Sequence, residues 1–540
     1  MNKTNFNLKN KVNLKRKQNN TREKEDTLRK RYAFKLSANF IGSGISAVIQ
    51  LMVPRSLGPA VYGNFGFMTA FFDNIVNSLD VGSSYWFYNR LSRKKEDKKI
   101  VVFYSLVMAG LIFLALSFVF IATITNINQK IWIDQTKQII YLAVLYSIMN
   151  WILDVNTKIM DAYVLTVNAE KARIIQRIIA LLIILVLFVL HKLNLVTFFI
   201  YHYFIIALLL FLYAIIARRG GYSTYPIANI KKEEGKYYLK SMYQYIYPLA
   251  IYTVVGLVVG IIDRWLLQKF GGSIQQGYFT LSFKISAIIA LFTVSLTPLL
   301  MREFSIAFDK KDINNMRAMY RRYLPIMYTI TAYLSCFVAV QYDKIVLFFG
   351  GGEYKKAGFV VMIMAFYPIH QTYGQLTSTV YYATGQTKLY RNIGVICMVL
   401  GLPVIYFLLA PVSMFGLDYG ALGLAIKMVL INIITVNIWL YFNTRFLKLS
   451  FGKFLLHQFG SITIILLIAV LAKLGVDIIP GLGDNIILSF ILSGVIYTAV
   501  IALISNYFPK LFGMDKESLN KVKIKLISKT HDFFSRIRRK

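Results

Sequence analysis

Long apolar runs alternate with short polar segments from residue 32 to residue 506. Each run holds about 20 residues, the length at which a helix crosses the roughly 30 Å hydrocarbon core of a bilayer. The pattern therefore predicts an all-α polytopic membrane protein with about fourteen membrane-spanning helices. The predicted spans are 32–53, 62–88, 100–124, 138–157, 172–190, 195–216, 243–267, 274–301, 323–341, 356–384, 390–410, 421–444, 453–472 and 484–506.

Composition supports this prediction and changes how the charge is interpreted. Hydrophobic residues make up 57% of the chain, and the mean hydropathy is +0.55. The formal charge of +36 would suggest nucleic-acid binding in a soluble protein. In a membrane protein, loops retained on the cytoplasmic side collect Lys and Arg, so the positive-inside rule explains the charge without nucleic acid.

The basic residues also predict the orientation in the membrane. A cytoplasmic N-terminus places most of the 61 Lys and Arg residues on the inner side. Residues 1–31 and 507–540 are then basic cytoplasmic tails that attract anionic membrane lipids. The first tail has no short apolar core or cleavage site, so it is not interpreted as a signal peptide. We expect a multi-pass protein of the cell membrane with both termini cytoplasmic.

Several classes of chemistry have no support in the sequence. Cys336 and Cys397 both lie in apolar runs, so we expect no disulfide framework, metal site or cofactor. No Walker A pattern occurs, which argues against direct ATP hydrolysis. The predicted outer loops do not exceed about 16 residues, too few for an extramembrane catalytic domain with its own core. These observations favour a transporter over an enzyme.

The two halves of the chain contain a weak repeat. In the first half, VPRSLGPAVYG at 53–63 runs into YGNF at 62–65; in the second, DRWLLQKFGG at 263–272 is followed by QGYF at 276–279. Both junctions are predicted on the outer side, so the repeat is parallel, as in transporters that bind substrate between two lobes. The predicted organisation is an N-lobe at 32–216, a cytoplasmic linker at 217–242, a C-lobe at 243–444 and two further helices at 445–506.

Ionisable residues inside the spans are candidate functional residues because they are costly in hydrocarbon. At about 1.5 Å per residue, Asp73 and Lys284 lie near the midplane, one in each lobe. They either pair with each other or are solvated in a cleft. Lys427 lies at a shallower depth, and Lys35 is explained most simply by snorkelling to the inner interface.

Two polar aromatic segments suggest a wet path. YPIHQTY at 367–373 contains His370, and YYATGQTK at 381–388 begins with Tyr381. Such residues suit a sugar-lined cavity better than lipid, although a lone histidine is more often a packed polar residue.

Five segments together resemble a known family. They are VPRSLGPAVYG with LDVG at 79–82, and the stretches 263–286, 348–367, 382–392 and 419–425. In this order and spacing they are similar to Wzx-type polysaccharide flippases, also called polysaccharide biosynthesis proteins. The resemblance implies the multidrug/oligosaccharidyl-lipid/polysaccharide exporter (MOP) superfamily, with two six-helix lobes in a V shape and two additional C-terminal helices.

The resemblance also implies a function. The substrate would be an undecaprenyl-diphosphate-linked oligosaccharide, moved from the inner to the outer leaflet by alternating access. The products would be capsule, exopolysaccharide or O-antigen, and other polysaccharide-assembly proteins are implied as partners.

A diphosphate needs cations, and the intramembrane Lys and Arg residues could supply them. The predicted substrate-binding residues are Lys284, Arg55, Arg264, Lys427, Lys35, Tyr381 and His370. Asp73 is the candidate for ion coupling. Arg55 and Arg264 are further expected to form a paired exit site, since each lies beside the first outer turn of its lobe.

Three alternatives remain at this stage. Lipid II flippases share the architecture and the number of spans. Multidrug extruders share the two bundles but expel organic cations and favour an acidic cleft. A polysaccharide polymerase or ligase would need a large outer loop with catalytic residues, which the prediction lacks. The sequence does not identify the sugar, the coupling ion or the oligomeric state.

Overall fold

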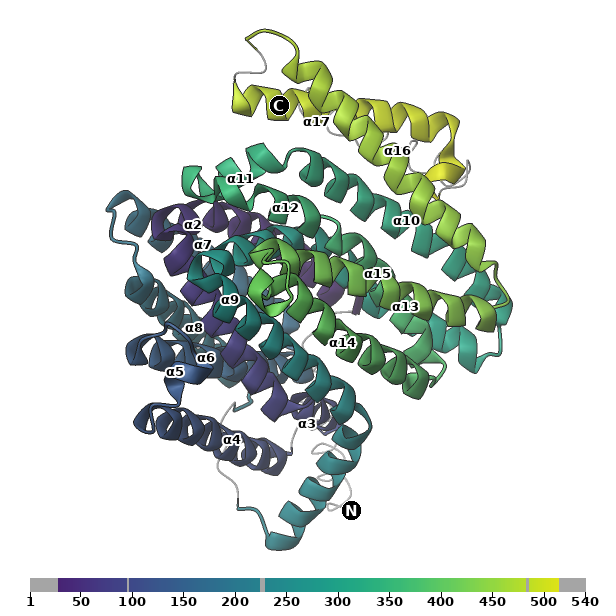
Figure 1. Ribbon diagram of the computed structural model, residues 1–540. Helices are drawn as coiled ribbons and strands as arrows, with labels where there is room; N and C mark the ends of the chain where they lie inside the picture. Colours follow the sequence, from purple (N-terminus) through teal and green to yellow (C-terminus); the bar gives the residue numbers. More distant parts are fainter. Residues whose placement is uncertain (1–27, 95–96, 224–228, 482–484, 514–540) are drawn as a thin grey trace, which may run out of the picture.

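The computed structural model describes residues 28–94, 97–223, 229–481 and 485–513, and all regular secondary structure in these ranges is helical (Figure 1). The α-helices are α2 (Leu28–Asp80), α3 (Ser83–Arg93), α4 (Lys98–Ile124), α5 (Asn128–Ile131), α6 (Lys137–Ala162), α7 (Thr166–Val189), α8 (Leu195–Arg219), α9 (Lys232–Asp309), α10 (Ile313–Val340), α11 (Tyr342–Gly350), α12 (Gly358–Met364), α13 (Tyr367–Ala383), α14 (Thr387–Leu409), α15 (Gly420–Phe446), α16 (Phe451–Asp477) and α17 (Ile486–Tyr507). Short 3₁₀ helices are η1 (Gly352–Ala357), η2 (Val412–Met414) and η3 (Pro509–Phe512).

The two longest helices, α2 and α9, each contain one sharp kink at a glycine. Gly58 in α2 has φ 69° and ψ 167°, and Gly272 in α9 has φ 70° and ψ −173°. Only glycine reaches this backbone region without a steric penalty. Each of these helices therefore supplies two membrane crossings joined by a tight turn.

The predicted number of spans agrees with this architecture. Eleven helices in the described part of the chain are long and apolar enough to cross a membrane. Two of them, at Ser37–Asp80 and Ala250–Ala290, run through a kink and count twice. The tenth predicted span is divided between α12 and α13. The chain is thus an all-α, multi-pass membrane protein, as predicted.

The helices form two groups with an appendage (Figure 1). Helices α2 to α8 make the first group and α9 to α15 the second, with α2 packed along α9 where the groups meet. Helices α16 and α17 lie outside both groups, and α16 packs on α10. The linker predicted at 217–242 is shorter than expected because α9 already begins at Lys232. Residues 1–27 and 514–540, predicted as basic tails, lie outside the described residues.

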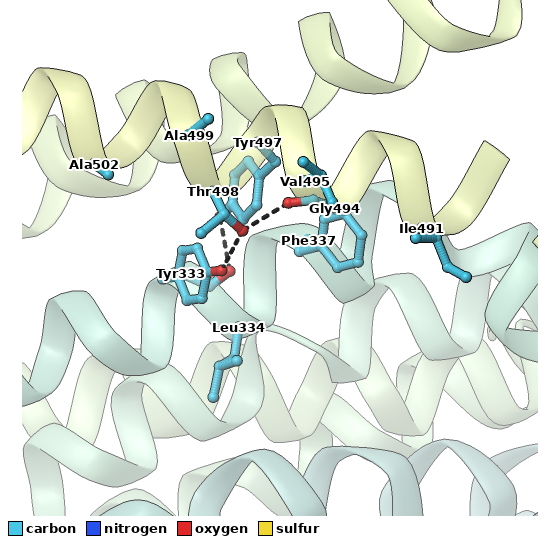
Figure 2. A pocket seen from close by; sticks show the side chains of 10 residues that line it. All are labelled: Tyr333, Leu334, Phe337, Ile491, Gly494, Val495, Tyr497, Thr498, Ala499 and Ala502. Carbon is cyan, nitrogen blue, oxygen red and sulfur yellow. Dashed lines mark hydrogen bonds between the residues drawn. The ribbon is translucent and has the colours of Figure 1, made fainter. Parts of the chain in front are cut away.

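An apolar groove of about 530 Å³ separates α10 from α17 (Figure 2). The Tyr333 and Thr498 hydroxyls meet at 2.8 Å across it, and Tyr497 donates a hydrogen bond to the Tyr333 carbonyl at 2.7 Å. These two contacts fix α17 on the rest of the molecule at one level and leave the neighbouring apolar surface open.

The two ends of the helix groups differ in the connections that they carry. We call the end that carries Gly58 and Gly272 the kink end. The opposite end carries the α3–α4, α8–α9 and α9–α10 connections, and we call it the basic end.

Candidate functional site

The two kinks define the register of the internal repeat. An offset of 214 residues superimposes Gly58 on Gly272, and it also places Tyr62 on Gln276 and Gln50 on Arg264. A side-chain hydrogen bond joins these equivalent positions across each kink, with the donor after the kink in α2 and before the kink in α9. Tyr62 donates to Gln50 Oε1 at 2.8 Å, and Arg264 Nη1 donates to Gln276 Oε1 at 3.0 Å. The repeat inferred from sequence is therefore also a repeat of side-chain contacts.

This register corrects the expected pairing of Arg55 with Arg264. Arg55 occupies the position of Lys269 in the second half, not that of Arg264. It is exposed and donates from Nη2 to the Leu347 carbonyl at 2.5 Å. Arg264 is half-buried, and its guanidinium lies 4.5 Å from the Phe279 ring centroid. The two arginines are thus in different environments and have separate partners.

Small residues bring the two helix groups together at the kink end. A Cβ atom built on Gly63 would lie 1.8 Å from the Ser273 carbonyl oxygen, and one on Gly277 would lie 2.0 Å from the Pro59 carbonyl oxygen. Because real Cβ atoms do not approach within 3.0 Å, these contacts are possible only with glycine. The contacts are reciprocal between equivalent parts of the repeat, and they close the kink end by direct backbone packing.

Hydrogen bonds surround this closure. Asn64 Oδ1 accepts from Ser273 Oγ at 2.5 Å and from Gln135 Nε2 at 2.8 Å. The loop after α5 adds a further link, since Gln268 Nε2 donates to the Ile133 carbonyl at 3.3 Å. The kink end is therefore held by uncharged groups from both halves of the chain, together with the Arg55 hydrogen bond to the Leu347 carbonyl.

Asp73 and Lys284 face each other across the boundary between the helix groups. Asp73 attracts Lys284 through space, and the Ser147 hydroxyl lies beside the Asp73 carboxylate. The Lys284 side chain is exposed. Within the described residues neither side chain forms a direct ion pair. Lys284 is therefore not engaged in an ion pair among the described residues.

Lys427 is in a different situation. Its ammonium lies 2.5 Å from Asp263 Oδ2, and the two side chains are only 6% and 13% exposed. Asp263 precedes Arg264 in α9, and neighbouring helical residues point about 100° apart. Asp263 therefore neutralises Lys427 inside the second helix group, while Arg264 bonds Gln276 after the kink. The sequence does not reveal this division because it depends on where α15 packs.

The remaining predicted residues are engaged within their own helix groups. Lys35 pairs with Asp161 Oδ2 at 2.9 Å, beside the α6–α7 turn at the basic end. Tyr381 is fully buried and donates its hydroxyl proton to the Trp439 carbonyl at 2.8 Å. His370 is buried with its ring edge-on to Tyr328, 5.9 Å between centroids. Tyr381 and His370 thus belong to the buried core of the second group in this conformation.

The basic end contains contacts that the sequence did not predict. Lys99 of α4 forms an ion pair with Glu234 of α9 at 2.6 Å, and the Tyr238 hydroxyl donates to Asp97 at 3.2 Å. Trp86 Nε1 of α3 donates to Ser241 Oγ at 3.2 Å. We call this set of contacts the basic-end latch. It fastens the first turns of α9 to the first helix group.

The latch shifts two pKa values in opposite directions. The Lys99 ammonium, which hydrogen-bonds Glu234, lowers the pKa of that carboxyl from its ordinary value. Burial, reinforced by the neighbouring Asp97 carboxylate, raises the pKa of Tyr238 to about 12. Glu234 is thus held ionised and Tyr238 protonated in the latched state.

Comparison with known proteins identifies the fold. No family model and no curated protein sequence matches the chain. Among solved structures, the lipid II flippase MurJ in an inward closed conformation matches with a TM-score of 0.63 at 16% identity, covering 89% of this chain and 99% of MurJ. A multidrug resistance MATE family transporter of the MOP superfamily in an inward-facing conformation matches with a TM-score of 0.58 at 13% identity, covering 77% of this chain and 96% of the transporter.

An outward-facing MATE family transporter of the same superfamily has a TM-score of 0.50 at 13% identity, with 78% of this chain and 96% of the transporter covered. The chain therefore has the fold of MOP superfamily transporters.

Proposed function

We propose that this protein is a flippase for undecaprenyl-diphosphate-linked oligosaccharides and works by alternating access. The basic end would face the cytoplasm, and the kink end would open to release the substrate in the outer leaflet. The transported units would feed the assembly of a capsule, an exopolysaccharide or an O-antigen.

The observation that carries the proposal is the state of Lys284. It is an accessible cation at the boundary between the two helix groups, it lacks a direct ion-pair partner in the described part of the chain, and Arg264 contributes positive charge nearby. A diphosphate is bound best by such charge-assisted donors in a site of low dielectric constant. Since Asp263 already neutralises Lys427, Lys284 and Arg264 are the central cations of the proposed site.

The second candidate function, lipid II transport, is supported by the extent of the match to MurJ. That match covers 89% of the chain, against 77% for the inward-facing MATE transporter. The difference is about 65 residues, similar to the length of the segment 451–512 that contains α16 and α17. Both candidate substrates carry a lipid-linked diphosphate, and an apolar groove such as that between α10 and α17 suits a lipid chain. Organic cations, the substrates of multidrug extruders, would be repelled by Lys284.

The central test is transport by the Lys284→Ala variant in proteoliposomes. Loss of a buried charge-assisted contact costs about 2–5 kcal/mol, so we expect flipping of a polyprenyl-diphosphate oligosaccharide to slow by at least about thirtyfold. Lys284→Arg should retain part of the activity because the charge is kept. Lys269→Ala removes an exposed lysine of the same helix and should have no effect. Wild-type rates in Lys284→Ala would refute the proposed role.

Substrate competition separates the candidate functions in the same vesicles. The proposal expects the lipid-linked oligosaccharide to be transported in preference to lipid II and to an organic cation. Preference for lipid II would favour the second candidate, and transport of the organic cation would overturn both.

Asp73 is the proposed coupling carboxylate because it faces Lys284 from the other helix group. Asp73→Asn keeps the shape of the side chain and removes its charge. We expect transport by this variant to become independent of an imposed ion gradient, measured as the ratio of rates with and without the gradient. An unchanged ratio would show that Asp73 has only a structural role.

A further inference from the structure

A second cationic site lies at the basic end, away from Lys284. It is a pocket of about 370 Å³ between α3 and the first turns of α9. The residues that line it are Trp86, Asn89, Arg90, Arg93, Lys94, Tyr237, Ser241 and Tyr245. Three cations, uncharged donors and aromatic side chains therefore converge in a volume that suits one small head group.

Arg90 is fixed at the centre of this pocket. Its guanidinium lies 4.8 Å from the Tyr237 ring centroid and 5.2 Å from that of Tyr238. Its Nη1 also lies 3.4 Å from Ser241 Oγ. Stacking on aromatic rings holds a guanidinium in place and leaves its outer N–H groups available to an anion.

Among the described residues, no ion pair gives the other two cations of the pocket, Arg93 and Lys94, a structural role. Arg93 and Lys94 are exposed, and neither forms an ion pair within the described part of the chain. Two acidic residues of this region are already engaged, since Asp97 bonds Tyr238 and Glu234 bonds Lys99. The positive field extends to Tyr237, whose pKa is lowered by Arg90 and, more weakly, by Lys94. The described residues that line the pocket therefore include three cations and no carboxylate.

The position of the pocket limits the chemical classes of ligand that it could bind. It lies at the basic end, where α3 follows the second crossing of α2 and α9 begins. Basic pockets between helices on the cytoplasmic side of a membrane bind phosphate-bearing lipid head groups. The exposed rings of Tyr237 and Tyr245 offer apolar surface to the group that carries the phosphate.

We infer that this pocket binds the phosphate groups of a lipid head group at the basic face. The lipid-linked diphosphate substrate, on its way to Lys284, and a bulk anionic phospholipid present the same chemistry; naming the first as ligand rests on the proposed function. One wall belongs to the first helix group and the other to α9. A bound phosphate therefore bridges the two groups beside the basic-end latch and stabilises the latched state.

The test is equilibrium binding of radiolabelled pyrophosphate to the full chain in nanodiscs. One preparation contains phosphatidylcholine alone, and the other an equimolar mixture with phosphatidylglycerol. Arg93→Gln/Lys94→Gln removes the two exposed cations and leaves Arg90 in place. Lys310→Gln/Lys311→Gln removes two exposed lysines from the α9–α10 turn of the same end and serves as the matched control.

We expect the Arg93→Gln/Lys94→Gln variant to bind pyrophosphate at least about tenfold more weakly than wild type, because two charge-assisted contacts are lost. The control should stay within about twofold of wild type. If wild type binds pyrophosphate in phosphatidylcholine nanodiscs but not in those with phosphatidylglycerol, bulk anionic lipid occupies the pocket. If wild type binds pyrophosphate in both preparations, the pocket prefers a diphosphate. Equal binding by wild type and the Arg93→Gln/Lys94→Gln variant in phosphatidylcholine nanodiscs would overturn the inference.

Transport assays on the same preparations separate this result from the proposed function. If the pocket binds no phosphate while Lys284-dependent flipping persists, the inference fails and the proposed function stands. If the pocket binds pyrophosphate while no lipid-linked oligosaccharide is flipped, the proposed function fails and the site remains a lipid-phosphate site.

Discussion

The kink end and the basic end join the same two helix groups by different physical means. At the kink end, Gly63 and Gly277 let the backbones of α2 and α9 touch, and hydrogen bonds between uncharged groups surround the contact. Arg55 adds a hydrogen bond to the Leu347 carbonyl, and no ion pair joins the two groups at this end among the described residues. At the basic end, the joining groups are the Lys99–Glu234 ion pair, the Tyr238–Asp97 hydrogen bond and the aromatic stacking of Arg90.

The difference predicts how each end responds to its surroundings. Backbone packing is short-ranged and insensitive to salt, and it fails abruptly when a single atom is added. Exposed ion pairs are weak, screened by salt and dependent on protonation. A transporter that alternates between ends would then have a firm closure at the kink end and an adjustable one at the basic end.

The largest expected effect is that of Gly277→Ala. The added Cβ would lie 2.0 Å from the Pro59 carbonyl oxygen, so the closed kink end must separate to accept it. Overpacking of this kind costs about 1–3 kcal/mol, which lowers the closed-to-open ratio about 5- to 150-fold. Spin labels at the exposed positions Lys192 and Phe415 would report a longer distance across the kink end.

Gly110→Ala is the matched control for this prediction. Gly110 is a helical glycine in α4 with open space around the position of a Cβ atom, so the variant should leave the label distance unchanged. An unchanged distance in Gly277→Ala would show that the kink end is not closed by backbone contact.

The smallest expected effect is that of pH on the basic-end latch. Because the pKa of Glu234 is lowered in the latched state, its contribution is complete above its ordinary pKa of 4.5 and is lost as the pH falls below it. Because the pKa of Tyr238 is raised from 10.0 to about 12, its contribution is complete below pH 10 and declines as the pH rises towards 12. The latched fraction should therefore be constant between about pH 5 and pH 10.

Spin labels at the exposed positions Lys98 and Lys240 would measure this fraction. In wild type the latched fraction should fall at acidic pH, and Glu234→Gln should abolish this fall, which we call the acid limb. At neutral pH the same variant should change the latched fraction by no more than about threefold. Glu233→Gln, one residue away and without an ion pair among the described residues, should keep the acid limb. An acid limb that survives in Glu234→Gln would show that another group controls this end.

Much of the fold could be predicted from local pattern. The spans follow from runs of apolar residues, and the two tight turns follow from LGP at 57–59 and GGS at 271–273, where a chain in lipid must reverse. The matched depth of Asp73 and Lys284 also follows from counting residues along straight helices, and the structure brings these two side chains into electrostatic contact.

The predicted site was less accurate where a residue's role depends on a distant partner. Lys427 and Lys284 look alike in sequence, each a single lysine in an apolar span. Asp263 pairs with the first, whereas the second has no ion pair among the described residues, and this difference depends on the packing of α15 against α9. Tyr381 likewise resembles a polar cavity residue in sequence, whereas in the structure it is buried and its hydroxyl donates a hydrogen bond to the Trp439 carbonyl.

By itself, the sequence determined that most of the chain lies in lipid, where the membrane-spanning helices run, that the two halves repeat, and at which positions charged side chains lie inside a span. These properties depend on hydrophobicity and on helical rise, which act along the chain. Only the tertiary structure decided the partner of Arg55, the ion pair that engages Lys427 but not Lys284, and the existence of the basic-end latch. Each of these rests on contacts between segments that are far apart in the chain, and packing sets those contacts.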